Sequence, residues 1–140
     1  MRVYNEVYGL PTVSLRYFTA YGPRMRPNMA ISNFVSRCMR GESPEIYGDG
    51  TQTRDFTYIA DVVDANRSLL RDDSADGKTM NIGSTDNIDI TTLAEVVRDE
   101  IDPTLDISYT EARDGDAEHT HADISKANEL INYEPSRDIR

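Results

Sequence analysis

The most informative stretch for predicting the fold is EIYGDGTQTRDFTYIADVV, residues 45–63. Two short segments, 45–47 and 54–58, are rich in β-branched and aromatic residues, and they flank the glycine-rich residues 48–50. This pattern predicts two extended segments around a tight turn. Asp61 then precedes an apolar run with helical spacing, and we expect its carboxylate to cap a helix.

Strands and helices alternate on both sides of this stretch. Alternating apolar and polar residues and short apolar runs predict strands at 12–18, 80–83 and 105–109. Apolar residues at three- and four-residue spacing predict helices, whose expected positions are 3–8 with Gly9 as the end, 30–40, from Asp61 to Arg71, from Thr91 or Thr92 to Ile101, and from Asp123 to Asn132. No repeat or linker interrupts this order, so we predict one compact α/β unit.

Composition restricts the class of protein. The formal net charge is −10 and no basic stripe is present, which argues against nucleic acid as a partner. Lysine occurs only at Lys78 and Lys126, and aspartate outnumbers glutamate, a pattern typical of proteins from a high-salt cytoplasm. No apolar run is long enough to cross a bilayer, and residues 1–8 lack the pattern of a signal peptide. We therefore expect a cytoplasmic protein with no membrane partner.

Cysteine, histidine and the acidic loop do not predict a metal site. Cys38 has no second cysteine to pair with and lies in a helical pattern, so we interpret it as a small buried side chain. His119 and His121 would share one face of a strand, but no nearby histidine or cysteine completes a ligand set, which favours an exposed pair. The acidic loop at 72–76 lacks the glycine and the distal glutamate of a calcium loop.

Two arginines lie beside glycines rather than on helix faces. Arg54 follows the turn at 48–50, and Arg113 precedes Gly115. A forked guanidinium group beside flexible backbone can hold a diphosphate, although surface ion pairs are the more common use of an arginine. The chain contains no Gly-x-Gly-x-x-Gly, P-loop, nucleophile elbow or Tyr-x-x-x-Lys, so none of its residues is predicted to be catalytic.

Five ordered blocks resemble the extended short-chain dehydrogenase/reductase family, and most specifically its NAD-dependent nucleotide-sugar epimerases. They are LRYFTAYGPR at 15–24, IYGDGTQTRDFTYIADVV at 46–63, NIG at 81–83, RDGD at 113–116 and ADISKA at 122–127. Five blocks in order are far more specific than one short motif. The resemblance implies an α/β fold that is the C-terminal, substrate-binding part of such an enzyme, with remnants of the Rossmann sheet and with the N-terminal NAD-binding half absent.

The resemblance also implies site residues, position by position. Arg54 and Arg113 would clamp the diphosphate of a UDP-sugar, and Asp116 would take a ribose hydroxyl. Tyr47 would lie near the uracil, which an aromatic face can stack against. Tyr21 would lie near the nicotinamide of NAD. The remaining implied contacts, around the sugar and the nucleotide, are Thr19, Asn28, Met29 and Ala30.

The implied function is UDP-sugar binding within an NAD-dependent UDP-sugar 4-epimerase, with residues 1–140 as one substrate-binding region. Threonine at Thr19, where many relatives have asparagine, and the segment 26–30 look more like UDP-glucuronate 4-epimerases. The glycine-rich fingerprint and the Tyr-x-x-x-Lys segment would lie upstream, so we expect these 140 residues alone to be inactive. A nucleotide-sugar 4,6-dehydratase, a non-catalytic nucleotide-sugar-binding module and a truncated remnant remain as alternatives.

The same resemblance has a consequence for folding. The strands at 12–18 and 80–83 would belong to a larger parallel sheet that is covered on both faces. Without that sheet, unpaired strand edges favour self-association or a homodimer. The side chains expected to be partly uncovered are Val13, Leu15, Tyr17 and Ile82.

Overall fold

The computed structural model describes residues 1–71 and 73–139, and these fall into two compact units. Unit 1 comprises residues 1–22, 55–86 and 121–139, and unit 2 comprises residues 23–54 and 87–120. Each unit is therefore built from segments far apart in the sequence. The alternating pattern of elements predicted one compact unit, and the structure differs because such a pattern does not specify which distant segments pack together.

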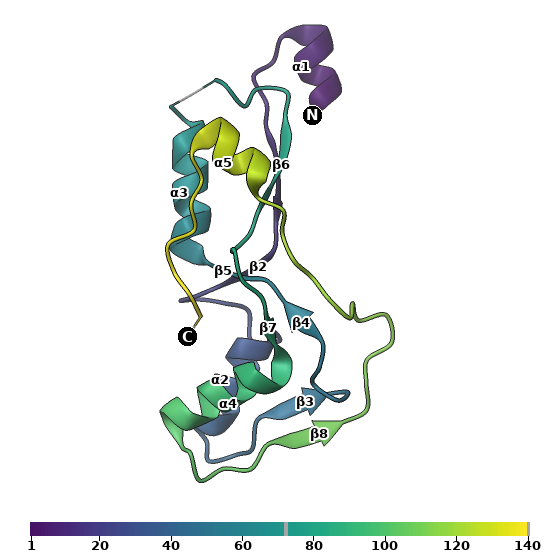
Figure 1. Cartoon of the computed structure of the whole chain (residues 1–140), viewed down its shortest axis with the longest axis vertical. Coiled ribbons are helices and arrows are strands. Elements are labelled where there is room, and N and C mark those ends of the chain that lie inside the picture. Colours follow the sequence, from purple (N-terminus) through teal and green to yellow (C-terminus); the bar gives the residue numbers. More distant parts are fainter. Residues whose placement is uncertain (72, 140) are drawn as a thin grey trace. The chain divides into compact units, whose positions relative to one another are not determined.

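Unit 1 combines two parallel strand pairs with helices. β1 pairs with β6, and β2 pairs with β5. Two of the helices, α3 and α5, lie side by side (Figure 1). The elements of unit 1 are α1 (Arg2–Tyr8), β1 (Ser14–Tyr17), β2 (Thr19–Tyr21), β5 (Phe56–Tyr58), α3 (Ile59–Leu69), β6 (Thr79–Ile82) and α5 (Ser125–Ile131).

The apolar core of unit 1 lies between β6, α3 and α5. Its buried members are Val62, Ala65, Ala75, Met80, Ile82, Ala127, Ile131 and Tyr133. Val13 and Leu15 pack against this core and are half-buried, whereas Tyr17 is 47% exposed. Ile82 is fully buried, so the expectation that it would be partly uncovered is wrong. The reason is that α5 packs on β6 and supplies the apolar cover.

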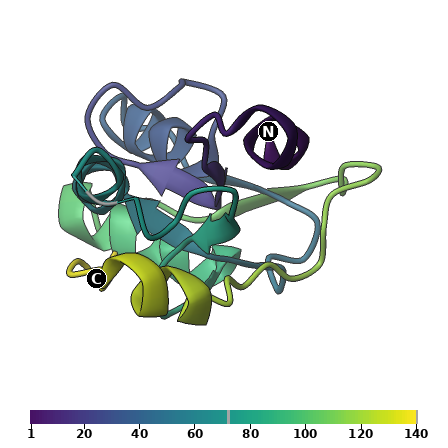
Figure 2. The same cartoon turned by 90° about the horizontal axis from the view of Figure 1, so that it is seen from above.

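α1 is the least integrated helix of unit 1. It lies apart from α3 and α5 in both Figure 1 and Figure 2, and none of its residues is buried. Gly9 ends it with φ 64° in the left-handed region, where a residue without a Cβ is favoured. The predicted helix end at Gly9 is confirmed.

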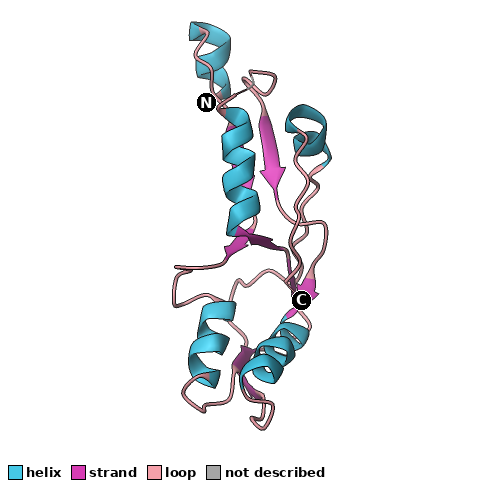
Figure 3. Ribbon diagram, turned by 90° about the vertical axis from the view of Figure 1, so that its left-hand side faces the viewer, coloured by secondary structure: helices cyan, strands magenta, loops and turns pink. Residues whose placement is uncertain are grey.

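Unit 2 places a pair of helices beside short strand pairs. α2 and α4 pack against each other (Figure 3). β3 pairs in parallel with β8, and β4 pairs antiparallel with β7. The elements of unit 2 are α2 (Ala30–Cys38), β3 (Glu45–Tyr47), β4 (Thr53–Arg54), β7 (Ile88–Asp89), α4 (Ile90–Ile101) and β8 (Ser108–Thr110).

The two extended segments predicted around residues 48–50 are present, but they do not pair with each other. Gly48 and Gly50 both have positive φ, at 79° and 80°. Asp49 between them accepts hydrogen bonds from the Thr51 amide at 3.0 Å and the Thr51 hydroxyl at 2.7 Å. This local turn redirects the chain, so β3 takes β8 as its partner while β4 takes β7 and β5 takes β2.

Asp61 is not the N-cap that the sequence predicted. α3 begins at Ile59, so Asp61 lies inside its first turn and is buried. Its Oδ1 accepts hydrogen bonds from the amide and the hydroxyl of Ser136, at 3.2 and 2.9 Å. The carboxylate therefore binds the C-terminal segment instead of the start of its own helix.

The starts of α4 and α5 also differ from the predictions. Asp89 caps α4 by accepting the Thr92 amide at 2.8 Å, so neither Thr91 nor Thr92 is the cap. Asp123 lies one residue before the N-cap of α5 and accepts the Ser125 amide at 3.0 Å. A short carboxylate reaches an amide two or three residues ahead, which shifts the helix start from where the pattern alone puts it.

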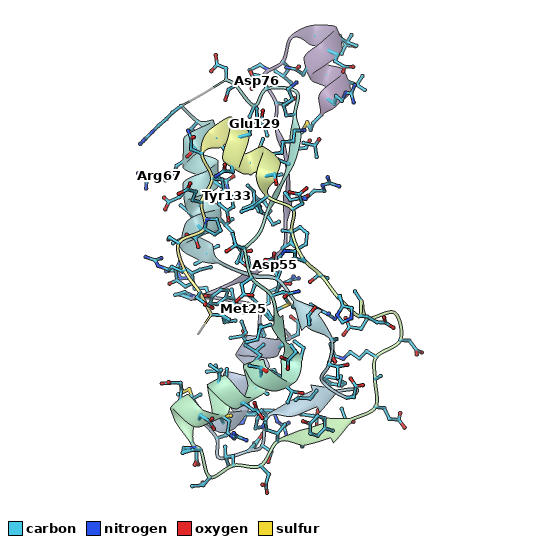
Figure 4. All side chains as sticks on the ribbon, in the orientation of Figure 1. Met25, Asp55, Arg67, Asp76, Glu129 and Tyr133 are labelled. Atoms are coloured by element: carbon cyan, nitrogen blue, oxygen red, sulfur yellow. The ribbon has the colours of Figure 1, made fainter. Side chains whose placement is uncertain are left out.

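Asp55 joins three segments of unit 1 and is fully buried. Its Oδ1 accepts the Ser84 amide at 2.8 Å, its Oδ2 accepts the Ala122 amide at 3.0 Å, and the Thr57 hydroxyl lies 3.2 Å from Oδ1. Figure 4 labels Asp55 just before β5 and Tyr133 just after α5. The Tyr133 hydroxyl donates to the Gly83 carbonyl at 2.8 Å. The turn after β6 is thus held from two sides.

Gly83 allows these segments to approach. A Cβ at this position would collide with Ala122 Cβ and would lie 2.9 Å from Asp55 Oδ2. Any larger side chain would therefore displace the segment that the Asp55 carboxylate holds.

Replacing Asp55 by Asn should lower the free energy of unfolding by about 1–3 kcal/mol, because an amide NH₂ group would face a backbone N–H and leave it unpaired. Urea unfolding followed by circular dichroism measures this change. Asp64→Asn, an exposed change on α3, is the matched control and should stay within about 0.5 kcal/mol of the starting protein. Equal stabilities of the two variants would contradict the role given to Asp55.

Candidate functional site

Unit 2 contains an open hollow of about 520 Å³. It is formed by the segments that follow β3 and β8, because parallel strands bring the residues after them to the same edge. The lining residues are Tyr47, Gly48, Asp49, Thr51, Gln52, Ala112, Arg113, Asp116, Ala117, Glu118 and His119.

β4 anchors the second of these segments. The Thr53 amide donates to the Glu118 carbonyl at 2.9 Å, and the Thr120 amide donates to the Thr53 carbonyl at 3.1 Å. Gly48 likewise donates to the Thr110 carbonyl at 3.0 Å. The segment from 111 to 119 is therefore fixed at both ends while its middle lines the hollow.

Tyr47 and Arg113 stack on each other. The guanidinium carbon of Arg113 lies 3.7 Å from the centroid of the Tyr47 ring, within the range of a cation–π contact. The Gln52 side-chain amide donates to the Tyr47 carbonyl at 2.8 Å and fixes the end of β3. An aromatic face and a cation thus lie together at one place in the hollow.

Arg54 and Asp116 form an ion pair. Nη2 of Arg54 lies 2.6 Å from Oδ1 of Asp116, and the two side chains are 13% and 48% exposed. Nη1 of Arg54 also donates to the Thr53 carbonyl at 2.8 Å. The surface ion pair that the sequence left open for Arg54 is thus present, and its partner is another residue expected to bind ligand.

The hollow carries both signs of charge. Arg113 lies among Asp49, Asp116 and Glu118. Hydrogen bonds from the amide and the hydroxyl of Thr51 hold the pKa of Asp49 below its ordinary value. The stacking face, the Arg113 guanidinium and the carboxylate acceptors of the hollow, together with the Arg54 guanidinium bonded to Asp116, suit a ligand that has an aromatic base, hydroxyl groups and anionic oxygens.

Asn28, Met29 and Ala30 lie at the start of α2 in unit 2, where Met29 is the N-cap. They do not belong to the lining of this hollow. The structure therefore unites four of the expected ligand residues, namely Tyr47, Arg54, Arg113 and Asp116.

Thr19 and Tyr21 lie on β2 in unit 1. The Tyr21 hydroxyl donates to the Asp138 carbonyl at 3.1 Å, and its ring meets those of Phe56 and Tyr58 edge-on. Burial, followed by the nearby Asp138 carboxylate, raises the pKa of Tyr21, so it stays a neutral hydroxyl at pH 7. In the described part of the chain no glycine-rich turn leads from a strand into a helix, so these residues do not fit a whole dinucleotide.

Sequence reasoning missed Thr53 and Asp55 and interpreted His119 and His121 as one pair. Both histidines are exposed, as expected, but His119 belongs to unit 2 and His121 to unit 1. His119 instead faces Thr53, whose Oγ1 lies 3.1 Å from its Nδ1. Nothing local signals this contact, because it joins residues far apart in sequence.

Other expectations can be compared with the described residues. Cys38 is 3% exposed, which confirms its interpretation as a buried side chain. No cluster of three or more His, Cys, Asp or Glu side chains with metal-binding geometry occurs within residues 1–71 and 73–139. In the same residues, every helix is too short or too polar to span a bilayer. Residue 72 of the acidic loop lies outside the described part.

Comparison with known proteins identifies the family. The family model described as "NAD dependent epimerase/dehydratase family" matches residues 1–83, which is more than half of the chain. The chain belongs to this family. The predicted membership among the NAD-dependent nucleotide-sugar epimerases and dehydratases is confirmed, and NAD is the cofactor of the complete family members.

Relatives of the epimerase family cover almost all of this chain. A UDP-glucose epimerase of Bacillus subtilis, itself uncharacterized, is 35% identical over 138 residues, which are 99% of this chain and 44% of the relative. Relatives of similar identity include UDP-glucuronic acid decarboxylases of Arabidopsis thaliana. The chain thus spans less than half the length of the relatives it matches.

Solved epimerase structures share the fold. UDP-glucose 4-epimerase of Thermotoga maritima, solved with UDP-glucose, matches with a TM-score of 0.91 and 31% identity over 98% of this chain and 45% of that one. UDP-glucuronic acid 4-epimerase of Bacillus cereus, solved with UDP-glucuronic acid and NAD, matches with a TM-score of 0.88 and 35% identity over 97% and 44%. The predicted α/β fold of an extended short-chain dehydrogenase/reductase is confirmed.

The contact between Tyr47 and Arg113 should be measurable without any ligand. A double-mutant cycle with Tyr47→Leu and Arg113→Gln should give a coupling free energy of about 0.5–1 kcal/mol, the range for a partly exposed cation–π pair. Urea unfolding of the four proteins supplies the values. Strictly additive changes would contradict the stacked arrangement.

Proposed function

We propose that this chain carries the UDP-sugar-binding site of an NAD-dependent UDP-sugar 4-epimerase, and that residues 1–140 act as its substrate-binding region. The observation that carries the proposal is the hollow in unit 2. It brings Tyr47, Arg113 and Asp116 together from two distant segments, with Arg54 bonded to Asp116. The names of the relatives, which share UDP-sugar substrates, support the same ligand.

In the proposed complex, each of these side chains takes one part of UDP. The uracil stacks on Tyr47, which requires Arg113 to leave that face and move to the diphosphate. Arg54 turns to the diphosphate as well, and Asp116 accepts a ribose hydroxyl. The ligand therefore exchanges the contacts Tyr47–Arg113 and Arg54–Asp116 for contacts of its own.

The energies favour this exchange. The Arg54–Asp116 ion pair, in which only Asp116 is half-exposed, is worth about 1 kcal/mol, and the cation–π contact is worth about 0.5–1 kcal/mol. Charge-assisted hydrogen bonds from a guanidinium group to a phosphate contribute about 1.5–3 kcal/mol each. The free site thus keeps its arginines ordered through weak contacts that a diphosphate can displace.

The remaining contacts are proposed from the family resemblance. Thr19, Asn28, Met29 and Ala30 would surround the sugar and the nucleotide, and Tyr21 would lie near the nicotinamide. In the complete enzyme, NAD would supply the oxidation at C4 of the sugar and the return of the hydride. The relatives named as decarboxylases of UDP-glucuronic acid make that reaction the second candidate, because it would use the same nucleotide contacts.

Binding of UDP should depend on both arginines. Arg54→Ala and Arg113→Ala should each weaken UDP binding by about 1.5–3 kcal/mol in isothermal titration calorimetry, since each removes a charge-assisted hydrogen bond. Arg67→Ala is the control, because Arg67 is exposed on α3 in unit 1. If both site variants bound UDP as tightly as the control, the proposed diphosphate clamp would be wrong.

The 140-residue chain by itself should not catalyse epimerisation. Its sequence contains neither Gly-x-Gly-x-x-Gly nor Tyr-x-x-x-Lys, which supply the NAD cradle and the proton-transfer pair in the family it resembles. Incubation with UDP-glucuronate or UDP-glucose and NAD should leave the sugar unchanged, and titration with NAD should give no heat. NAD-dependent conversion by the purified chain would overturn this expectation.

A further inference from the structure

We propose that His119 is a further ligand-contacting residue of this site, whose imidazole is held by Thr53 and donates its Nε2–H to a diphosphate oxygen. The inference rests on the proposed function, because it assumes a nucleotide diphosphate in the hollow of unit 2. It adds a donor that neither the sequence blocks nor the names of the relatives point to.

A relay of side chains orients the imidazole. The Asn87 amide nitrogen donates to Thr53 Oγ1 at 3.3 Å, and Thr53 Oγ1 lies 3.1 Å from His119 Nδ1. Because the Thr53 oxygen already accepts from Asn87, its own proton can be donated to Nδ1. With the hydrogen bond in this direction, the neutral imidazole carries its proton on Nε2. The backbone bridge between Thr53 and His119 holds the same two residues in register.

His119 also has the right place for a ligand contact. It lines the hollow with Arg113 and Asp116, and it is exposed. Since Nδ1 faces Thr53, Nε2 lies on the opposite side of the ring, and no described residue forms a hydrogen bond with it. A histidine with one nitrogen fixed by the protein and a second one open to a hollow is suited to donate to a ligand.

The charge balance of the hollow favours a diphosphate oxygen as the acceptor. Asp49, Asp116 and Glu118 supply acceptors on the protein side, so the hollow needs donors for an anionic ligand. Arg54 and Arg113 provide charged donors once they exchange Asp116 and Tyr47 for the diphosphate. His119 adds a donor in either protonation state, because both the neutral tautomer described above and the imidazolium carry a proton on Nε2.

The test compares UDP-glucose with uridine, which lacks the diphosphate. In calorimetry with the full chain, His119→Ala should weaken UDP-glucose binding about tenfold to a hundredfold and should change uridine binding less than about twofold. His121→Ala, an exposed histidine in unit 1, is the matched control and should bind both ligands like the starting protein. Melting curves should coincide for the two variants.

The role of Thr53 as a positioning residue has its own readout. Thr53→Val should remove the hydrogen bond to His119 Nδ1, so that both neutral tautomers of His119 become populated and the ¹⁵N shifts of its Nδ1 and Nε2 move toward each other. Thr53→Ser should restore both the shifts and the UDP-glucose affinity. Unchanged UDP-glucose binding in His119→Ala, with binding weakened in Arg113→Ala, would overturn this inference and leave the proposed function standing. Absence of UDP-glucose binding to the starting protein would overturn both.

Discussion

The buried carboxylate of Asp55 is the constraint on which unit 1 depends. Burying a carboxylate is costly unless its oxygens accept hydrogen bonds. The Asp55 oxygens accept from the backbone amides of Ser84 and Ala122 and from the Thr57 hydroxyl. The Asp55 carbonyl accepts the Thr19 amide at 3.1 Å as well, which aligns β2 with β5. One residue thus fixes the start of β5, the turn after β6 and the approach to α5.

Unit 2 depends on an equivalent constraint made by backbone pairing. The parallel pair of β3 and β8 brings the two lining segments of the hollow to one edge, and Thr53 holds the second segment from its other end. Arg54 follows Thr53 in β4, so the residue that anchors the loop is next to the residue that pairs with Asp116. The positions of the charged side chains are therefore consequences of strand pairing.

Local pattern was enough to predict some of this structure. The apolar spacing located the helices, Gly9 ended α1, Cys38 was buried, and the ordered blocks identified the family. The blocks also contain Arg113, which lines the hollow, and Arg54, which pairs with Asp116. Long-range contacts could not be predicted in this way. Arg54 and Asp116 are 62 residues apart, and the burial of Ile82 under α5, the division into two units and the relay from Asn87 to His119 likewise join segments that share no local signal.

The most direct test is a map of where UDP binds, by ¹H–¹⁵N spectra of the full chain during a UDP titration. If the hollow in unit 2 is the nucleotide site, the side-chain signals of Arg54, Arg113 and Gln52 should move together with one dissociation constant. The side-chain signals of Arg67 and Lys126 in unit 1 should stay in place. Saturable shifts that spare Arg54 and Arg113, or no shifts at all with excess UDP, would contradict the account.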